Sequence, residues 1–356
     1  MCWFPDKKKG NQHLSSVLED KKVFKYIARR VLFLIPTLLL VSFFVFCIIK
    51  AAPGDPAQLA LGEGATEENI EAKRIELGLD RPFVVQYLDW LYNIIFHFDF
   101  GNSYRSNISV SYQIKNYFPN TLKLSGFSVL WGMLIGVPLG MIAAVKQYSP
   151  FDNMVMSLAM IGMSVPAFVL ALAMILLFSV TLHWLPSSGF NNFSQMIMPI
   201  VALGMQPCAI CARMTRSSML EVIRQDYIRT VRAKGQSEPK VVVLHALKNA
   251  LMPILTTVGL QFGALIGGAF VTETIFLIPG FGRLLVTAVT NRDYPLVLGG
   301  VTVVAMVVAL TNLVIDIAYA FIDPRVRAEF KKGSGLLSHI RMKKEIMRSL
   351  EEAHEK

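Results

Sequence analysis

The sequence predicts an all-α integral membrane protein with six transmembrane helices. Hydrophobic residues make up 53% of the 356 residues and charged residues only 17%, whereas about 25% of the residues in a typical soluble domain are charged. The apolar residues are also gathered into blocks, and most blocks reach the roughly 20 residues that cross a hydrocarbon core of ~30 Å. Because a segment in lipid must satisfy its own backbone hydrogen bonds, each block is expected to form a helix.

Six blocks with few or no charged residues mark the expected spans. They are residues 31–49, 124–145, 154–182, 194–212, 249–272 and 296–315. The first block follows a basic segment, as a secretory signal does, but it is long for a signal and Lys50 disrupts the expected cleavage site. It is therefore interpreted as a retained anchor. The fourth block begins weakly, and its helix is expected to continue past Arg213 into the cytoplasm.

The distribution of basic residues predicts the orientation of the chain. With a cytoplasmic N-terminus, 26 of the 35 Lys and Arg residues lie in the four cytoplasmic segments, which are residues 1–30, 146–152, 213–248 and 323–356. This is the positive-inside pattern, and it accounts for the net charge of +10 without nucleic acid as a partner. Both termini are therefore expected in the cytoplasm.

Changes in composition divide the chain into five segments. A long polar segment with helical patterns separates the first two spans and predicts a small external subdomain. The segments are a cytoplasmic N-terminal extension (1–22), the first transmembrane helix with its basic lead (23–50), the external segment (51–116), a transmembrane domain (117–322) and a cytoplasmic basic tail (323–356).

A polar stretch interrupts the apolar blocks after the fourth span. It begins at Asp226 and reads DYIRTVRAKGQSEPKVVVLHALKNAL. A helix is expected over Ser217–Lys234, Gly235 fits the left-handed residue that commonly ends a helix, and Ser237 fits the cap of the next helix. Pro239 is tolerated in the first turn of that helix. The stretch therefore predicts a short helix pair that protrudes into the cytoplasm.

The first helix of this pair has an apolar cluster and a set of basic residues. The apolar side chains are those of Tyr227, Ile228 and Val231, and the basic ones those of Arg229, Arg232 and Lys234. One interpretation is a solvated connection whose charges only obey the positive-inside rule. A DNA-binding helix-turn-helix also fits the pattern, but attachment to a span at each end disfavours it. Docking to another protein is the third interpretation.

Several strings along the chain resemble one known family, in order. RTVRAKG (229–235) and HALKNAL (245–251) resemble the EAA loop of ABC-importer membrane subunits, and more narrowly that of the B-type permease of dipeptide and oligopeptide transporters. Further matching strings are YIARRVLFLIPTLLLVSFFVF (26–46), APGDP (52–56), LGLDRPFVVQYLDWL (77–91), FDFGNSYRS (98–106), RMTRSSMLEV (213–222), ETIFLIPGFGRLL (273–285), NRDYPLV (291–297) and IDPRVR (322–327). The resemblance covers residues 22–327. It departs from the general motif at Arg229–Val231, which replace the EAA letters, and at Leu247–Lys248, where that motif has Leu-Pro.

The resemblance implies a type I ABC importer permease fold with a coupling helix that docks into a cleft on a cytoplasmic ATP-binding subunit. The residues implied for this coupling are Tyr227, Ile228, Arg229, Val231, Arg232, Ala233, Lys234, Gly235 and Ser237. The implied partners are a second homologous permease subunit, one or two ATP-binding subunits, an external solute-binding protein, a peptide-like solute and the lipids of a prokaryotic inner membrane. ATP and Mg would bind the partner subunit, and this chain would carry no cofactor.

No catalytic or metal-binding constellation is expected in this chain. The phosphate-binding pattern G-x-x-x-x-G-K-[ST] is absent, and no Gly-Lys dipeptide occurs anywhere. The six histidines are dispersed along the chain without the spacing of metal ligands. These absences favour a non-catalytic subunit, with ATP hydrolysis on another polypeptide.

Charged residues within or beside the spans are candidates for the translocation path. The candidates for the path or its outer gate are Glu273, Asp316, Pro279 and Gly280. Glu273 lies at the outer end of the fifth span, where it either shapes the mouth of the path or forms a structural pair with Arg283 or Arg292. Asp316 lies within the sixth span, where bonding within the helix bundle is the alternative to a role in transport.

Two other functional classes compete with an ATP-driven permease. A secondary transporter would need intramembrane acid–base relays or broken helices at mid-membrane, for which only Asp316 and Glu273 are candidates. A thiol oxidoreductase would use Cys208 and Cys211, although cysteine within a span commonly packs as a small hydrophobe. Permeases of the resembled family serve dipeptides, oligopeptides, nickel complexes and glutathione, and the choice rests largely with the binding protein.

Overall fold

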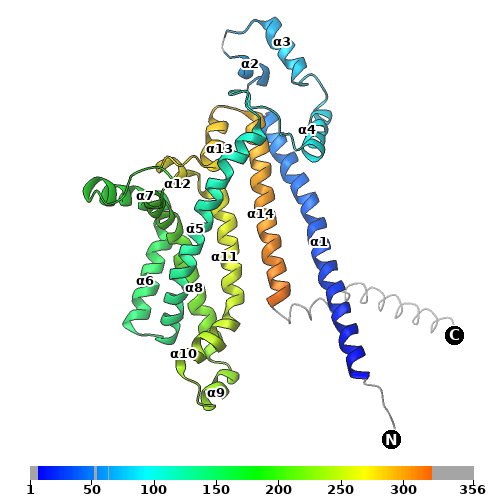
Figure 1. Ribbon diagram of the computed structural model, residues 1–356. Coiled ribbons are helices and arrows are strands. Elements are labelled where there is room, and N and C mark those ends of the chain that lie inside the picture. Colours follow the sequence, from blue (N-terminus) through cyan, green and yellow to red (C-terminus); the bar gives the residue numbers. More distant parts are fainter. Residues whose placement is uncertain (1–6, 52–53, 63, 323–356) are drawn as a thin grey trace, which may run out of the picture. The chain divides into compact units, whose positions relative to one another are not determined.

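The computed structural model describes residues 7–51, 54–62 and 64–322, so the predicted tail at 323–356 lies outside the described residues. The chain forms two compact units, residues 1–34 with 313–356 and residues 35–312. The second unit contains most of the described residues (Figure 1). It also contains every predicted site residue except Asp316.

Helices make up nearly all of the described secondary structure, beside one isolated bridge between Asn102 and Ser109. The helices are α1 (Lys7–Ala51), α2 (Pro56–Leu61), α3 (Glu67–Glu76), α4 (Phe83–His97), α5 (Val110–Val145), α6 (Pro150–Ser164), α7 (Ala167–Met174), α8 (Phe193–Ile223), α9 (Asp226–Ala233), α10 (Glu238–Lys240), α11 (Lys248–Gly268), α12 (Phe270–Ile275), α13 (Phe281–Thr290) and α14 (Tyr294–Ile322). Wider π-helical turns extend α7 through Ile175–Thr181 and join α10 to α11 through Val241–Leu247.

Five helices among the described residues are long and apolar enough to cross a membrane, or six if the bent pair α6 and α7 counts as one span. The all-helical architecture is therefore confirmed, but the expected span at 154–182 is not one continuous helix. Its two halves are bent by 99°. The break falls at Val165, which is extended at φ −77° and ψ 120°, because Pro166 follows it and disfavours the helical conformation of the residue before it.

The most extensive contact between helices joins α5 to α8. Glycines on α5 recur every fourth residue at Gly132, Gly136 and Gly140, so they lie along one face of the helix. A Cβ atom on Gly132 would stand 2.8 Å from the backbone nitrogen of Cys208, and one on Gly136 or Gly140 would overlap a carbonyl oxygen of α8. The two backbones approach this closely only because the glycines have no side chain.

Cys208 and Cys211 belong to this contact. Both thiols are free and buried, and the Cβ atom of Cys211 lies 3.0 Å from the place that a Cβ on Gly136 would occupy. The cysteines therefore fill space on the α8 side of the crossing, as small apolar residues do.

The described residues between α1 and α5, 54–109 without 63, form the cap segment. It contains α2, α3 and α4, at the end of the helix bundle opposite α9 (Figure 1). Tyr87 of α4 is buried with Phe46 of α1 and Leu298 of α14, and its hydroxyl lies 2.9 Å from that of Ser42. These contacts fix α4 on the ends of α1 and α14, although α4 also keeps apolar side chains exposed, such as Phe96.

A buried aspartate fixes the other end of the cap segment. Asp293, which precedes α14, accepts hydrogen bonds from the hydroxyl of Ser103 and from the backbone N–H of Tyr104, the latter at 3.0 Å. Burial, together with the nearby Asp293 carboxylate, raises the pKa of Tyr104 to about 12, so this phenol stays protonated. The strings NRDYP and FGNSYRS therefore meet in space.

Candidate functional site

The polar stretch after α8 folds into a compact turn, here called the α9 loop (residues 224–240). The expected continuous helix over Ser217–Lys234 is wrong, because α8 ends at Ile223 and α9 begins at Asp226. Gln225 between them is extended, at φ −72° and ψ 147°. This break turns α9 back toward the bundle, where Ile228 is buried.

The residues that end α9 and begin α10 are largely as expected. Gly235 has φ +76°, and nothing lies within 4 Å of where its Cβ would be. Glycine is therefore favoured here by the left-handed backbone, and not by a close approach. Ser237 occupies the cap position of α10 but makes no side-chain cap hydrogen bond, and Pro239 lies in the first turn.

The apolar face of α9 is turned into the chain itself. Ile228 is fully buried in a cluster with Ala144 of α5, Met219 of α8 and Ala246 before α11. The expectation that Ile228 is available to a partner is therefore wrong, because folding has already removed its side chain from the surface. Val231 packs against the same cluster while staying partly exposed.

The outward side of α9 is polar and mostly basic. Tyr227 is 39% exposed, and its hydroxyl accepts a hydrogen bond of 2.7 Å from the amide of Asn249. The side chain of Arg229 is 76% exposed and lies 3.8 Å from the carboxylate of Asp226. Lys234 is also exposed, as is the neighbouring Ala233. These side chains form the free face of the α9 loop.

Arg232 is used within the loop. Its guanidinium donates to both carboxylate oxygens of Glu238, at 2.6 and 3.1 Å. The pair spans the turn at Gly235 and holds the end of α9 beside the start of α10. Three basic residues were expected to meet acidic groups of a partner. Among the described residues Arg229 has only the long contact with Asp226 and Lys234 has no ion pair, whereas Arg232 already has a hydrogen-bonded carboxylate.

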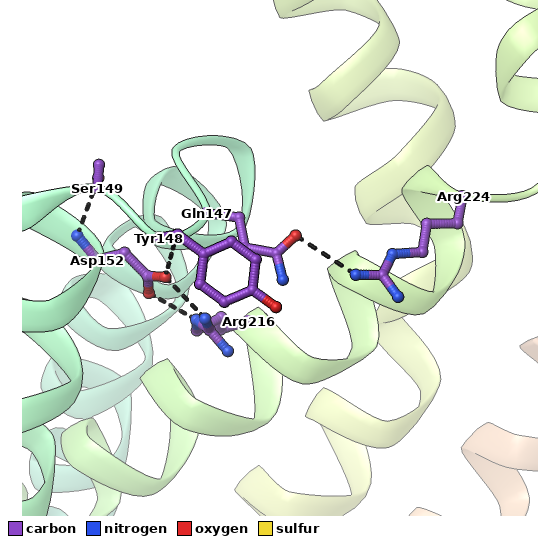
Figure 2. A network of polar contacts seen from close by, with 6 residues as sticks. All are labelled: Gln147, Tyr148, Ser149, Asp152, Arg216 and Arg224. Atoms are coloured by element: carbon purple, nitrogen blue, oxygen red, sulfur yellow. Dashed lines mark hydrogen bonds and ion pairs between the residues drawn. The ribbon is translucent and has the colours of Figure 1, made fainter.

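A polar network at the α5–α6 turn lies beside the base of the α9 loop, and Figure 2 shows its residues. Asp152 is 1% exposed and accepts two hydrogen bonds from the guanidinium of Arg216 on α8, at 2.6 and 2.7 Å. The backbone N–H of Tyr148 donates a third at 2.9 Å. Gln147 accepts a longer hydrogen bond of 3.4 Å from Arg224, the residue directly after α8.

This network was not foreseen from the sequence. The signal for it is an Asp in the first turn of α6 and an Arg near the end of α8, two opposite charges at the ends of apolar helices. The pair fixes the start of α6 on α8, so the turn and the base of the α9 loop are held together.

Glu273 has a structural position in the folded chain. Its fully buried carboxylate accepts hydrogen bonds from the hydroxyl of Thr121 and, at 2.8 Å, from the backbone N–H of Arg283. The hydroxyl of Thr121 in turn accepts the backbone N–H of Phe281 at 2.8 Å. Thr121 and Glu273 thus satisfy N–H groups at the start of α13 that have no partner within the helix. The expected side-chain ion pair of Glu273 with an arginine does not form among the described residues; the Arg283 backbone is its partner instead.

The turn at Pro279 and Gly280 packs directly against the Glu273 carboxylate and α5. A Cβ on Gly280 would overlap the carboxylate of Glu273, and the carbonyl oxygen of Pro279 accepts a hydrogen bond of 2.8 Å from Asn120. These residues therefore position the start of α13 against α5. Asp316 lies on α14, but its side chain is outside the described residues.

Replacing Glu273 with glutamine should lower the free energy of unfolding by ~1–3 kcal/mol, because the new amide removes charge and places N–H donors where N–H donors already point. Thr121→Val should cost less, about 1 kcal/mol. Thermal unfolding of the purified protein in detergent measures both. Equal stability of Glu273→Gln and the parent would contradict the capping role, and a shift in solute preference at unchanged stability would indicate the path instead.

Comparison with known proteins agrees with this architecture. Residues 136–328 match the family model described as the binding-protein-dependent transport system inner membrane component, and residues 23–125 match the N-terminal model of the same kind of system. A chain from the structure titled "Inward facing conformations of the MetNI methionine ABC transporter" aligns with a TM-score of 0.50 at 20% identity, covering 60% of this chain and 97% of the other. That likeness concerns the fold alone.

Two relatives with higher sequence identity align with this chain over almost their whole length. A dipeptide transport system permease protein of Alkalihalophilus pseudofirmus is 42% identical over 330 residues, which cover 85% of this chain and 99% of the relative. A glutathione transport system permease protein of Salmonella typhimurium is 43% identical over 305 residues, with 86% and 99% covered. The chain belongs to the family of binding-protein-dependent transport system inner membrane components, and it is a membrane permease subunit of the ABC importer class.

Proposed function

We propose that this permease subunit translocates peptides across the cytoplasmic membrane, driven by ATP hydrolysis on a separate subunit that docks on the α9 loop. In this proposal the chain pairs with a second homologous permease and receives its solute from an external binding protein. One or two ATP-binding subunits complete the assembly. The relatives named for dipeptides and for glutathione, itself a small peptide, support this solute class.

The single observation that carries the coupling proposal is the fixed yet exposed position of α9. Ile228 anchors the helix in a core shared with α5, α8 and the start of α11, while Arg229 and Lys234 point outward without a strong partner. A docking helix needs both properties. Its free face must recognise a partner, and its buried face must transmit a rigid-body shift to the spans.

The orientation follows from the same proposal. The α9 loop and both termini lie in the cytoplasm, where the ATP-binding subunit is, as the excess of Lys and Arg on that side favours. The cap segment then faces the outside, where it and the α12–α13 segment receive the binding protein.

Charge reversal at Arg229 tests the coupling. Arg229→Glu should weaken association with the ATP-binding subunit about tenfold, or ~1.4 kcal/mol, because a basic contact becomes repulsive toward an acidic rim. Uptake of a labelled dipeptide into proteoliposomes should fall with it. The midpoint of thermal unfolding should not change, since the Arg229 side chain is 76% exposed.

The matched control is Lys115→Glu, the same change of charge at an exposed position of α5 far along the chain from the α9 loop. It should leave association with the ATP-binding subunit unchanged. Normal association and uptake in Arg229→Glu would overturn the coupling proposal. If the parent protein associates with the ATP-binding subunit but takes up no dipeptide, the coupling proposal stands and the proposed peptide solute is wrong.

A further inference from the structure

The cap segment lines a cavity to which the proposed coupling at the α9 loop gives no role. The cavity has a volume of about 950 Å³ and is lined by the end of α1, the cap segment and the start of α14. This volume lies within the range of about 300–1,000 Å³ that is usual for small-molecule sites. Its wall is mixed, with aromatic and apolar side chains beside several charged ones.

Two buried polar atoms, each on a residue that lines the cavity, have no hydrogen-bond partner among the described residues. They are the indole nitrogen of Trp90 on α4 and the hydroxyl of Tyr294 at the start of α14. A buried polar group without a partner costs about 1–3 kcal/mol, and such groups are uncommon in folded proteins. Both can donate a hydrogen bond, and the indole nitrogen can do nothing else.

The positively charged side chain of Lys50 lines the same cavity. Lys50, at the end of α1, is partly buried, and its ammonium donates to the neutral amide oxygen of Gln86. It also lies 5.7 Å from the centre of the Phe46 ring. Lys50 forms no ion pair with a carboxylate of the described residues.

Six other charged side chains of this wall are paired with one another, whereas Asp99 and Arg105 also line the cavity without such a pair among the described residues. Asp55 pairs with Arg74 at 2.6 Å, Lys73 with Glu76 at 2.7 Å, and Arg81 with Asp89 at 2.7 Å. Burial alone would raise the pKa of Asp55, but the hydrogen bonds from Arg74 and from the N–H of Ala57 hold it below its usual value. Asp55 is thus an ionised group whose first partner is Arg74.

We infer that this cavity is a binding site for a small carboxylate-bearing solute, held by Lys50, Trp90 and Tyr294. A carboxylate supplies only acceptors, and these three side chains supply only donors or, for the tyrosine, a hydroxyl that can donate. Hydrogen bonds between a carboxylate and a cation are about twice as strong as neutral ones. The inference does not depend on which solute the permease transports, because the site lies at the cap segment and the adjoining ends of α1 and α14, and not in the middle of the spans.

The test compares two probes that differ only at the carboxylate, glycylglycine and its C-terminal amide. The full-length chain, purified with the subunits that accompany it, is held in lipid nanodiscs without ATP, and binding is titrated by saturation-transfer NMR. Glycylglycine should bind at least about tenfold more tightly than the amide. Because no ATP is present, loss of coupling or of uptake would not affect the result.

Variants locate the site. Lys50→Gln should weaken glycylglycine binding about tenfold, and Trp90→Phe and Tyr294→Phe about three- to tenfold each, since these two keep the ring and remove only the donor. The controls are Trp184→Phe and Tyr92→Phe, which make the same changes at side chains 70% and 55% exposed outside the cavity. They should bind glycylglycine as the parent does.

Four results would overturn the inference. Equal binding of the two probes would show that the carboxylate is not recognised, and absence of saturable binding would show that water alone fills the cavity. Tight binding that survives all three cavity variants would place the site elsewhere. If the three variants weaken only association with an external binding protein, the cavity receives an acidic side chain of that partner and not a free solute.

Discussion

Replacing Gly140 with alanine is expected to destabilise the protein by ~3 kcal/mol, the upper part of the range for overpacking a close contact. A Cβ at this position would overlap the backbone carbonyl oxygen of Ala212 and stand 2.8 Å from the Cβ of Thr215. A backbone atom cannot rotate away as a flexible side chain can, so α5 and α8 must separate. The thermal unfolding midpoint in detergent, followed by tryptophan fluorescence, measures the loss.

Gly126→Ala on the same helix is the matched control. A Cβ there would meet the Phe262 ring at 3.8 Å, an ordinary van der Waals distance. Alanine is favoured over glycine inside a helix by about 1 kcal/mol, so this variant should be as stable as the parent or more stable. If Gly140→Ala and Gly126→Ala behaved alike, the close crossing of α5 and α8 would not be a main source of stability.

Arg216→Gln is the second change with a large expected effect. It leaves the 1%-exposed carboxylate of Asp152 without its two guanidinium donors. Breaking a fully buried pair costs about 3–5 kcal/mol. The side chain of Arg216 keeps 23% of its surface exposed, so solvent screens the pair and the expected loss is ~2–3 kcal/mol. The change in unfolding midpoint at neutral pH measures it.

Two further variants separate pairing from local polarity. Arg216→Lys keeps the charge but loses the two-pronged geometry, so its stability should fall between that of Arg216→Gln and the parent. Arg224→Gln removes only the 3.4 Å hydrogen bond to Gln147 in the same network and should cost less than about 0.5 kcal/mol. A loss in Arg224→Gln as large as that in Arg216→Gln would contradict the central position of the Asp152–Arg216 pair.

Hydropathy predicted the approximate places of the spans because each apolar block must be helical in lipid. The predicted number, six, is met if the bent pair α6 and α7 counts as one span. Hydropathy missed the bend at Pro166, since the blocks on both sides of this proline are equally apolar. The glycine spacing on α5 was available as a pattern every fourth residue, but its meaning depends on which helix faces it. That helix, α8, lies beyond the whole of α6 and α7 in the chain.

The candidate site was predicted in part for a similar reason. Gly235 needs only local backbone geometry, and the sequence sufficed to place it. The burial of Ile228 depends on Ala144 and Ala246, which are distant in sequence, so an apolar residue on a short polar helix gave no sign of whether it faced its own chain or a partner. The role of Glu273 could not be predicted for the same reason, because its partners are the hydroxyl of Thr121 on the distant helix α5 and a backbone N–H at the start of α13.

The way Ile228 is buried has a mechanical consequence. Four elements converge on it, and its cluster includes side chains from α5, α8 and both sides of the junction into α11, while the Arg232–Glu238 pair closes the turn beyond it. A force applied to α9 therefore does not act on one helix alone. It is shared at once by three long helices, α5, α8 and α11, so these helices are expected to move together.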